Sequence, residues 1–110
     1  MPHEVVKKTV AAVVGQNVTL PCRTTLRTPV DWYYLASENE RGKFVCTSGY
    51  LVNGYDSRFA LDRRIFGDFS LIIPNVTLED AGVYVCRENA GLGVEHRTKL
   101  TVDGKTCLIS

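Results

Sequence analysis

The sequence lacks a strong net charge, a long apolar run and the short motifs of catalysis. Its formal net charge is +1, so no strong field is available to attract nucleic acid or an anionic membrane. The longest apolar runs, such as Val10 to Val14, are far too short to cross a bilayer. No glycine-rich phosphate loop follows a strand and opens a helix. These absences argue against an enzyme and against a nucleic-acid-binding protein, and they imply no cofactor.

Histidine and clustered basic residues are also scarce. The chain has two histidines, and we expect His96 to be a surface residue on an outward-leaning strand beside Glu95 and Arg97. That position favours an ordinary surface residue over a catalytic base. The basic pairs Lys7-Lys8 and Arg63-Arg64 are short, so we interpret them as solvated edges in preference to contacts for heparin-like polyanions.

Cysteine, in contrast, is well represented for a chain of this length. There are 4 cysteines in 110 residues, and none belongs to a Cys-x-x-Cys pair. This spacing favours an oxidising compartment over a structural zinc site. Two sequons begin at Asn17 and Asn75 and are candidate glycosylation sites. The sequence therefore predicts an extracellular location, at the cell surface or secreted.

A period-two alternation of apolar and polar residues runs through almost the whole chain and predicts many short strands. The length allows one domain, which we place at residues 5–103. Residues 1–4 are expected to be leader or added residues, and residues 104–110 a tail or linker. The opening strand at Val5 to Val14 is expected to be broken into two parts. A single helical turn is expected at Leu78 to Asp80.

The most specific pattern joins two cysteines, a tryptophan and a tyrosine. Cys22 is followed by Trp32, and Cys86 closes the stretch Leu-Glu-Asp-Ala-Gly-Val-Tyr-Val-Cys that contains Tyr84. Together these residues resemble an immunoglobulin domain over nearly the whole chain. The resemblance implies a Cys22–Cys86 disulfide, worth roughly 4 kcal/mol in the loop-closure description. It also implies that Trp32 packs on this bridge between two sheets and that the Tyr84 hydroxyl turns back onto the preceding corner.

The spacing between the Trp32 strand and the strand near Phe66 leaves room for two extra strands. We therefore expect an all-β, two-sheet antiparallel sandwich of the variable type, with about nine strands. The family resemblance also implies an Arg58–Asp80 ion pair, the alternative being two solvated charges. Gly91 to Gly93 is similar to a hairpin tip and not to the joining motif of rearranged receptors, which favours a non-rearranging receptor or adhesion protein.

The outward-facing positions of the sheet that carries Trp32 are unusually apolar. Tyr33, Leu35 and Val85 are expected to form an apolar strip, extended by Phe44 or Val45. The charged residues that border this strip include Arg87 and Arg97. An apolar centre with a polar border is typical of a protein–protein contact. The alternative is a set of scattered surface apolar residues.

The first functional hypothesis is a recognition domain of a cell-surface adhesion or immune receptor. It would bind a protein ligand, or a second copy as a homodimer, through the apolar strip, and its parent protein would be membrane-attached. The alternative is a secreted innate-immune domain that binds microbial carbohydrate through its loop edge. Tyr50, Asn53 and Tyr55 would then contact the sugar.

The remaining two cysteines, Cys46 and Cys107, leave three alternatives open. Crossing three strand spacings takes roughly 15 Å, and five extended residues reach about 17 Å, so a bridge within the domain is feasible. Cys107 could instead bridge to another molecule, or both residues could be thiols.

Overall fold

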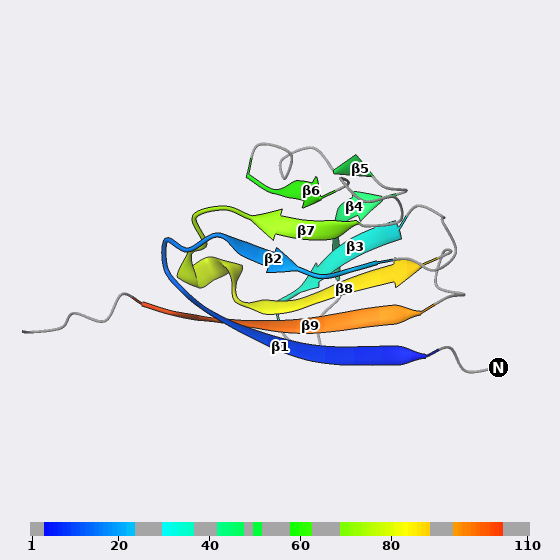
Figure 1. The fold of residues 1–110 in the computed structure, drawn as a ribbon, viewed down its shortest axis with the longest axis horizontal. Helices are drawn as coiled ribbons and strands as arrows, with labels where there is room; N and C mark the ends of the chain where they lie inside the picture. The colour runs from blue at the N-terminus through cyan, green and yellow to red at the C-terminus, as the bar shows by residue number, and fades with distance from the viewer. Residues whose placement is uncertain are drawn as a thin grey trace, which may run out of the picture.

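The computed structural model describes residues 4–23, 30–36, 42–47, 50–51, 58–62, 69–88 and 94–104. These residues form nine strands in two sheets, as predicted, and one short 3-10 helix between β7 and β8 (Figure 1). Most strands are short and rich in β-branched or aromatic residues, which suit a pleated and half-buried surface. The strands are β1 Val5–Val13, β2 Val18–Leu20, β3 Val30–Leu35, β4 Lys43–Thr47, β5 Tyr50–Leu51, β6 Ala60–Asp62, β7 Ser70–Ile73, β8 Gly82–Glu88 and β9 Glu95–Asp103.

The two sheets differ in size. The larger sheet has the order β1-β9-β8-β3-β4-β5, and the smaller has the order β2-β7-β6. β1 runs parallel to β9, whereas the other neighbours are antiparallel. The predicted break in the opening strand is wrong, because all nine residues of β1 pair with β9 in one register.

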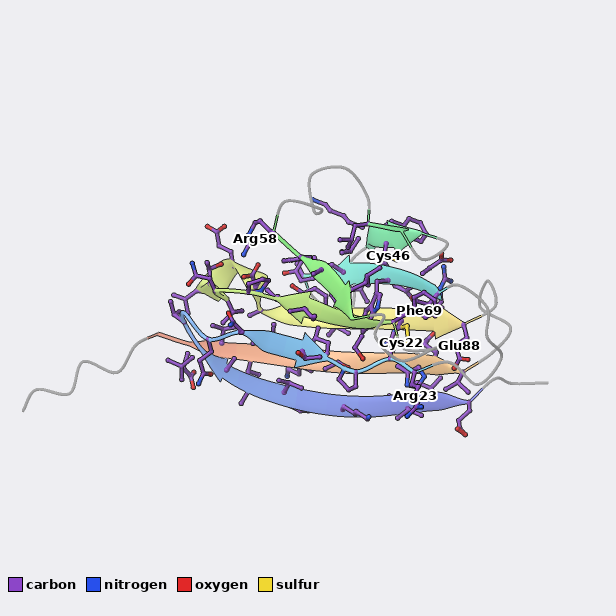
Figure 2. All side chains as sticks on the ribbon, turned by 45° about the horizontal axis from the view of Figure 1, so that its top comes forward. Cys22, Arg23, Cys46, Arg58, Phe69 and Glu88 are labelled. Carbon is purple, nitrogen blue, oxygen red and sulfur yellow. A yellow bond between two sulfur atoms is a disulfide. The ribbon has the colours of Figure 1, made fainter. Side chains whose placement is uncertain are left out.

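The core lies between the sheets, around one disulfide and one indole. Cys22 and Cys86 form the disulfide, with Cα atoms 6.4 Å apart, and Trp32 is completely buried. The Trp32 Nε1 donates a hydrogen bond to the Phe69 carbonyl oxygen at 2.7 Å, which satisfies the indole in an apolar interior. Figure 2 shows Phe69 beside the bridge at Cys22. Alternate residues of β2 and β7, such as Val18 and Leu20 or Leu71 and Ile73, also lie in this core.

The corner between β7 and β8 is held by hydrogen bonds from two tyrosines. The helix η1 spans Leu78–Asp80, at the predicted position, and Tyr84 donates to the Asp80 carbonyl oxygen at 2.8 Å. Tyr34 donates to the Ala81 carbonyl oxygen at 2.6 Å. Gly82 has φ +148°, and a Cβ there would lie 2.7 Å from the Leu35 carbonyl oxygen, so the corner requires glycine. Among the described residues, no helix is long and apolar enough to span a membrane.

Candidate functional site

The outer surface of the large sheet carries the residues predicted to contact a partner. The register pairs Tyr33 of β3 with Val85 of β8, and Leu35 with Val83. Successive side chains of a strand alternate between faces, so these four lie on the side opposite Trp32. The structure brings all four together, and we refer to Tyr33, Leu35, Val83 and Val85 as the outer cluster.

The outer cluster is more deeply buried than an open sheet face would be. Leu35 and Val83 retain 5% and 6% exposure, and Val85 retains none. Tyr33 is half-buried, and its neighbour on β4, Phe44, is 46% exposed. The apolar surface open to solvent is therefore centred on Phe44 and the edge of Tyr33, and it is narrower than the sequence suggested.

The ring of Tyr33 is held from three sides. Phe44 meets it edge-on with ring centroids 6.1 Å apart, and the Arg87 guanidinium carbon lies 4.8 Å from its centroid. Gly42 lies so close that an added Cβ would be 2.4 Å from Tyr33 Cδ2. These four residues line a shallow hollow of about 260 Å³ on the sheet surface. Gly42 was not predicted to be part of this surface, because nothing in the sequence distinguishes it from an ordinary turn glycine.

Charged side chains border the outer cluster on the β9 side, as expected. Arg97 lies opposite Val85 in the register, and its Nε donates to Glu95 Oε2 at 2.9 Å. Lys99 lies opposite Val83 and is exposed. Two of the three charged residues named on this border, Arg97 and Lys99, are basic.

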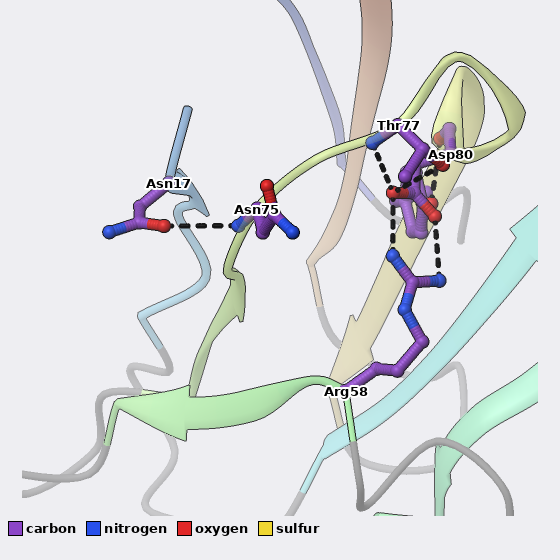
Figure 3. A network of polar contacts seen from close by, with 6 residues as sticks. Asn17, Arg58, Asn75, Thr77 and Asp80 are labelled. Atoms are coloured by element: carbon purple, nitrogen blue, oxygen red, sulfur yellow. Dashed lines mark hydrogen bonds and ion pairs between the residues drawn. The ribbon is translucent and has the colours of Figure 1, made fainter. Parts of the chain in front are cut away.

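A second polar site closes the base of the sandwich (Figure 3). Arg58 donates from both terminal nitrogens to the two carboxylate oxygens of Asp80, at 3.0 and 2.9 Å. Thr77 adds hydrogen bonds to the same carboxylate from its backbone N–H and its hydroxyl, at 2.8 and 3.2 Å. Burial alone would raise the pKa of Asp80, but the bonds from Arg58 and Thr77 outweigh it, so the pKa of Asp80 is lowered. This arrangement stabilises the fold at the corner before β8.

The opposite end of β8 and β9 holds a buried carboxylate that the sequence analysis did not single out. Glu88 is 1% exposed, and its Oε2 lies 3.3 Å from Nε2 of His96. Figure 2 shows Glu88 at the far end of β8 from Arg58. The prediction of an outward-leaning surface histidine is wrong, because the register pairs His96 with Cys86 and turns it to the inner face. Only the register of the β8–β9 hairpin places His96 opposite Cys86, and the sequence does not specify that register.

The structure describes only one of the two additional cysteines. Cys46 is a buried thiol on β4, and its Sγ lies 3.6 Å from the Val30 carbonyl oxygen. Cys107 lies outside the described residues. The second bridge therefore stays a prediction.

The two sequons lie side by side in space. Asn17 Oδ1 accepts a hydrogen bond from the backbone N–H of Asn75 at 3.0 Å, and both residues are exposed (Figure 3). Asn75 has φ +51°, in the left-handed region that asparagine tolerates better than most residues. Exposure is compatible with glycosylation at either position, which stays a prediction.

The predicted carbohydrate edge lies mostly outside the described residues. Asn53 and Tyr55 are not described, and for Tyr50 only its place in β5 is given. This alternative therefore stays a prediction. No group of three or more histidine, cysteine or acidic side chains that could hold a metal is found within the described ranges.

Comparison with known proteins agrees with this architecture. The family model of the immunoglobulin V-set domain matches residues 5–103, which include both core cysteines and all nine described strands. The chain belongs to the immunoglobulin V-set family. The resemblance seen in the cysteines, the tryptophan and the tyrosine is thereby confirmed.

Several curated proteins are similar to this chain. The human "Hepatitis A virus cellular receptor 2" is 39% identical over 88 residues, which cover 69% of this chain and 28% of that protein. The human "Cytotoxic and regulatory T-cell molecule" is 32% identical over 85 residues, covering 72% of this chain and 19% of that protein. "CXADR-like membrane protein" of Xenopus tropicalis is 31% identical over 90 residues, covering 72% and 27%. The chain thus spans less than a third of the length of these relatives.

Proposed function

We propose that this chain is the extracellular recognition domain of a cell-surface adhesion or immune receptor that binds a protein partner through the outer face of its large sheet. The observation that carries the proposal is the exposed Phe44 ring beside Tyr33, at the margin of the buried outer cluster. An aromatic pair next to arginine is the composition that protein interfaces favour. The membrane protein and the cellular receptor among its relatives support the same class.

The depth of the outer cluster decides which residues meet the partner. Val85 and Leu35 are covered, so they support the contact surface from beneath. The hollow at the surface is lined by Phe44, Tyr33 and Arg87, and a partner side chain would enter it between these residues. The β9 border with Arg97 then forms the polar rim.

The test compares two substitutions of exposed apolar residues by lysine. Phe44→Lys changes the proposed contact, whereas Leu78→Lys makes the same chemical change on η1, where Leu78 is 58% exposed. Tetramers of the biotinylated domain are applied to a panel of leukocyte lines, and the mass of the domain is measured by sedimentation across concentration. We expect Phe44→Lys to abolish cell binding or self-association, and Leu78→Lys to preserve it.

Equal binding by the two variants would refute the contact at Phe44. Loss of self-association alone would identify the partner as a second copy, and loss of cell binding alone would identify a different protein. Circular dichroism of both variants distinguishes a lost contact from a lost fold.

A further inference from the structure

Strand β1 forms an open border of the large sheet. It pairs with β9 on one side, and no described segment pairs with its other side (Figure 1). Its nine residues make it, with β9, the longest strand described. A long exposed edge is a template for another strand, and proteins usually shorten or cover it.

The pairing of β1 identifies the backbone groups that face outward. In a parallel ladder, alternate residues direct both backbone groups to the same neighbour. At the ends of β1, the Glu4 carbonyl oxygen accepts from Glu95 N–H and Val14 N–H donates to the Asp103 carbonyl oxygen, both at 2.9 Å. Even-numbered residues therefore face β9, and odd-numbered residues face away from it.

One end of this edge is closed by the chain itself. Val13 donates its N–H to Gln16 Oε1 at 2.8 Å and accepts at its carbonyl oxygen from Gln16 N–H at 3.0 Å. This capping confirms that the odd-numbered residues point outward. It also confines the open part of the edge to the backbone groups of Val5, Lys7, Thr9 and Ala11, and these four residues are classed as exposed.

The open edge adjoins a cationic groove on the outer face. The groove has a volume of about 230 Å³ and is lined by Lys7, Lys8, Thr9, Val83, Arg97 and Lys99. The register places Lys7 beside Arg97 and Thr9 beside Lys99. Four of these six described lining residues are basic, and none of the six is acidic. Glu95 forms an ion pair with Arg97 at the border of this groove.

We propose that the β1 edge binds an extended, acidic segment of a partner protein as an added strand, with carboxylates of that segment in the groove. The backbone of the added strand would pair with Lys7 and Thr9, and its acidic side chains would face Lys7, Arg97 and Lys99. Two independent features, hydrogen-bonding groups that pair with none of the described strands and a predominantly basic lining, indicate the same ligand.

Lys7 and Lys8 also disfavour the binding of some strands at the β1 edge. A second copy that pairs antiparallel with all four open residues of β1 would place the two Lys8 residues opposite each other, at a cost from like charges. A sulfated glycan would satisfy the charges but could not continue the ladder of backbone hydrogen bonds. An acidic strand is the ligand that uses both features.

The probe is a synthetic peptide of about eight residues that alternates glutamate and valine, a usual strand length. The matched control peptide alternates lysine and valine. Binding is measured by fluorescence anisotropy, and amide hydrogen exchange of the domain is followed by NMR. We expect the acidic peptide alone to bind, to protect the Lys7 and Thr9 amides, and to bind more weakly as NaCl is raised from about 50 to about 300 mM.

Two pairs of variants separate the backbone from the charge. Thr9→Pro removes an outward N–H while leaving the β1–β9 ladder its donors, and it should weaken binding about tenfold or more, whereas Thr9→Ala should not. Lys7→Glu should weaken binding about tenfold, whereas Lys43→Glu on β4 makes the same charge change away from the groove and should not. If Thr9→Pro does not fold, the same hydrogen bonds can be tested from the side of the ligand. An acidic peptide that is N-methylated on the amides facing β1 should then bind more weakly.

Several results would overturn the proposal. These are equal binding of the two peptides, absence of amide protection at Lys7 and Thr9, or an unchanged affinity on N-methylation. Binding of a heparin fragment that depends on Lys7 but not on the Thr9 N–H would assign the groove to sulfated glycans. Self-association lost in Thr9→Pro would assign the edge to a second copy. The site does not depend on the contact at Phe44, since Phe44→Lys should bind the acidic peptide normally.

Discussion

The two faces of the large sheet bury apolar side chains to similar depth by different means. On the inner face, Trp32 and the Cys22–Cys86 bridge are covered by the second sheet, and the indole also donates to the Phe69 carbonyl oxygen. On the outer face no sheet covers Val85 among the described residues, yet it too has no exposed surface. Its cover is formed by neighbouring side chains such as Tyr33, which Arg87 overlies.

The inner face is thus buried by a second sheet, whereas the outer face is buried by neighbouring side chains. A layer is held by a ladder of backbone hydrogen bonds and a disulfide, whereas long side chains can move aside at the cost of a few contacts. The inner face is therefore suited to stability. Under the proposed function, a partner would displace Arg87 or pack on Phe44 at the outer face without unfolding the sheet.

The largest expected effect on the free energy of unfolding comes from truncating one buried side chain on each face to alanine. Trp32→Ala should lower the free energy of unfolding by about 3–5 kcal/mol, through lost packing and the lost hydrogen bond to Phe69. Val85→Ala removes a smaller side chain whose cover can relax, and should cost about 2 kcal/mol. Urea denaturation of both variants measures the difference. A cost for Val85→Ala equal to that of Trp32→Ala would show that the outer cluster is as rigid as the core.

The next effect concerns the ion pair at the base of the inner face. Asp80→Asn should lower stability at neutral pH by about 1–3 kcal/mol, a value reduced because the Arg58 side chain is 46% exposed. The pKa of Asp80 is lowered from its ordinary 3.8, so its contribution is complete above that value and is lost as pH falls through the folded-state pKa.

The measurement for Asp80→Asn is the denaturation midpoint as a function of pH. The wild type should lose stability on acidification more steeply than the variant, and the two curves should converge at low pH. Parallel curves would mean that Asp80 is not the titrating group. Glu79→Gln on η1, where the side chain is exposed, is the control, and should change stability by about 0.5 kcal/mol or less, as exposed surface charges do.

The smallest expected effect is a gain in stability. Thr98 is completely buried on the inner face, and its hydroxyl has no hydrogen-bond partner among the described residues. Thr98→Val should raise the free energy of unfolding by about 1 kcal/mol, because an unsatisfied hydroxyl is costly to bury. Thr101→Val is the matched control on the same strand, since that hydroxyl donates to the Val10 carbonyl oxygen and should yield no gain. A loss on Thr98→Val, measured by thermal denaturation, would contradict this account.

Much of the inner face was predictable from particular residues. Cys22, Trp32 and Cys86 indicated the sandwich, and the aspartate and tyrosine before Cys86 indicated the corner. The period-two alternation placed the core side chains correctly, because a pleated strand turns each second residue to the same face. It also placed Tyr33, Leu35 and Val85 together on the outer face.

The exposure of the outer face was not predictable in the same way. The alternation predicts which face a side chain occupies. It does not predict how deeply Tyr33 and its neighbours bury the other side chains of the outer cluster. The approach of Gly42 to Tyr33 depends on the path of the chain into β4. The pairing of Glu88 with His96 depends on the register of β8 and β9, where a shift of one residue would have turned His96 outward.

The sequence by itself determined the family and the inward face of each strand, because these follow from residue types at characteristic spacings, and the family resemblance implied the pairing of Cys22 with Cys86. The tertiary structure alone decided that the outer cluster is covered and that β1 is one continuous strand with an open edge. It also brought Lys7 beside Arg97, which are far apart in the chain. Such features depend on the register and neighbours of strands, which local spacing does not specify.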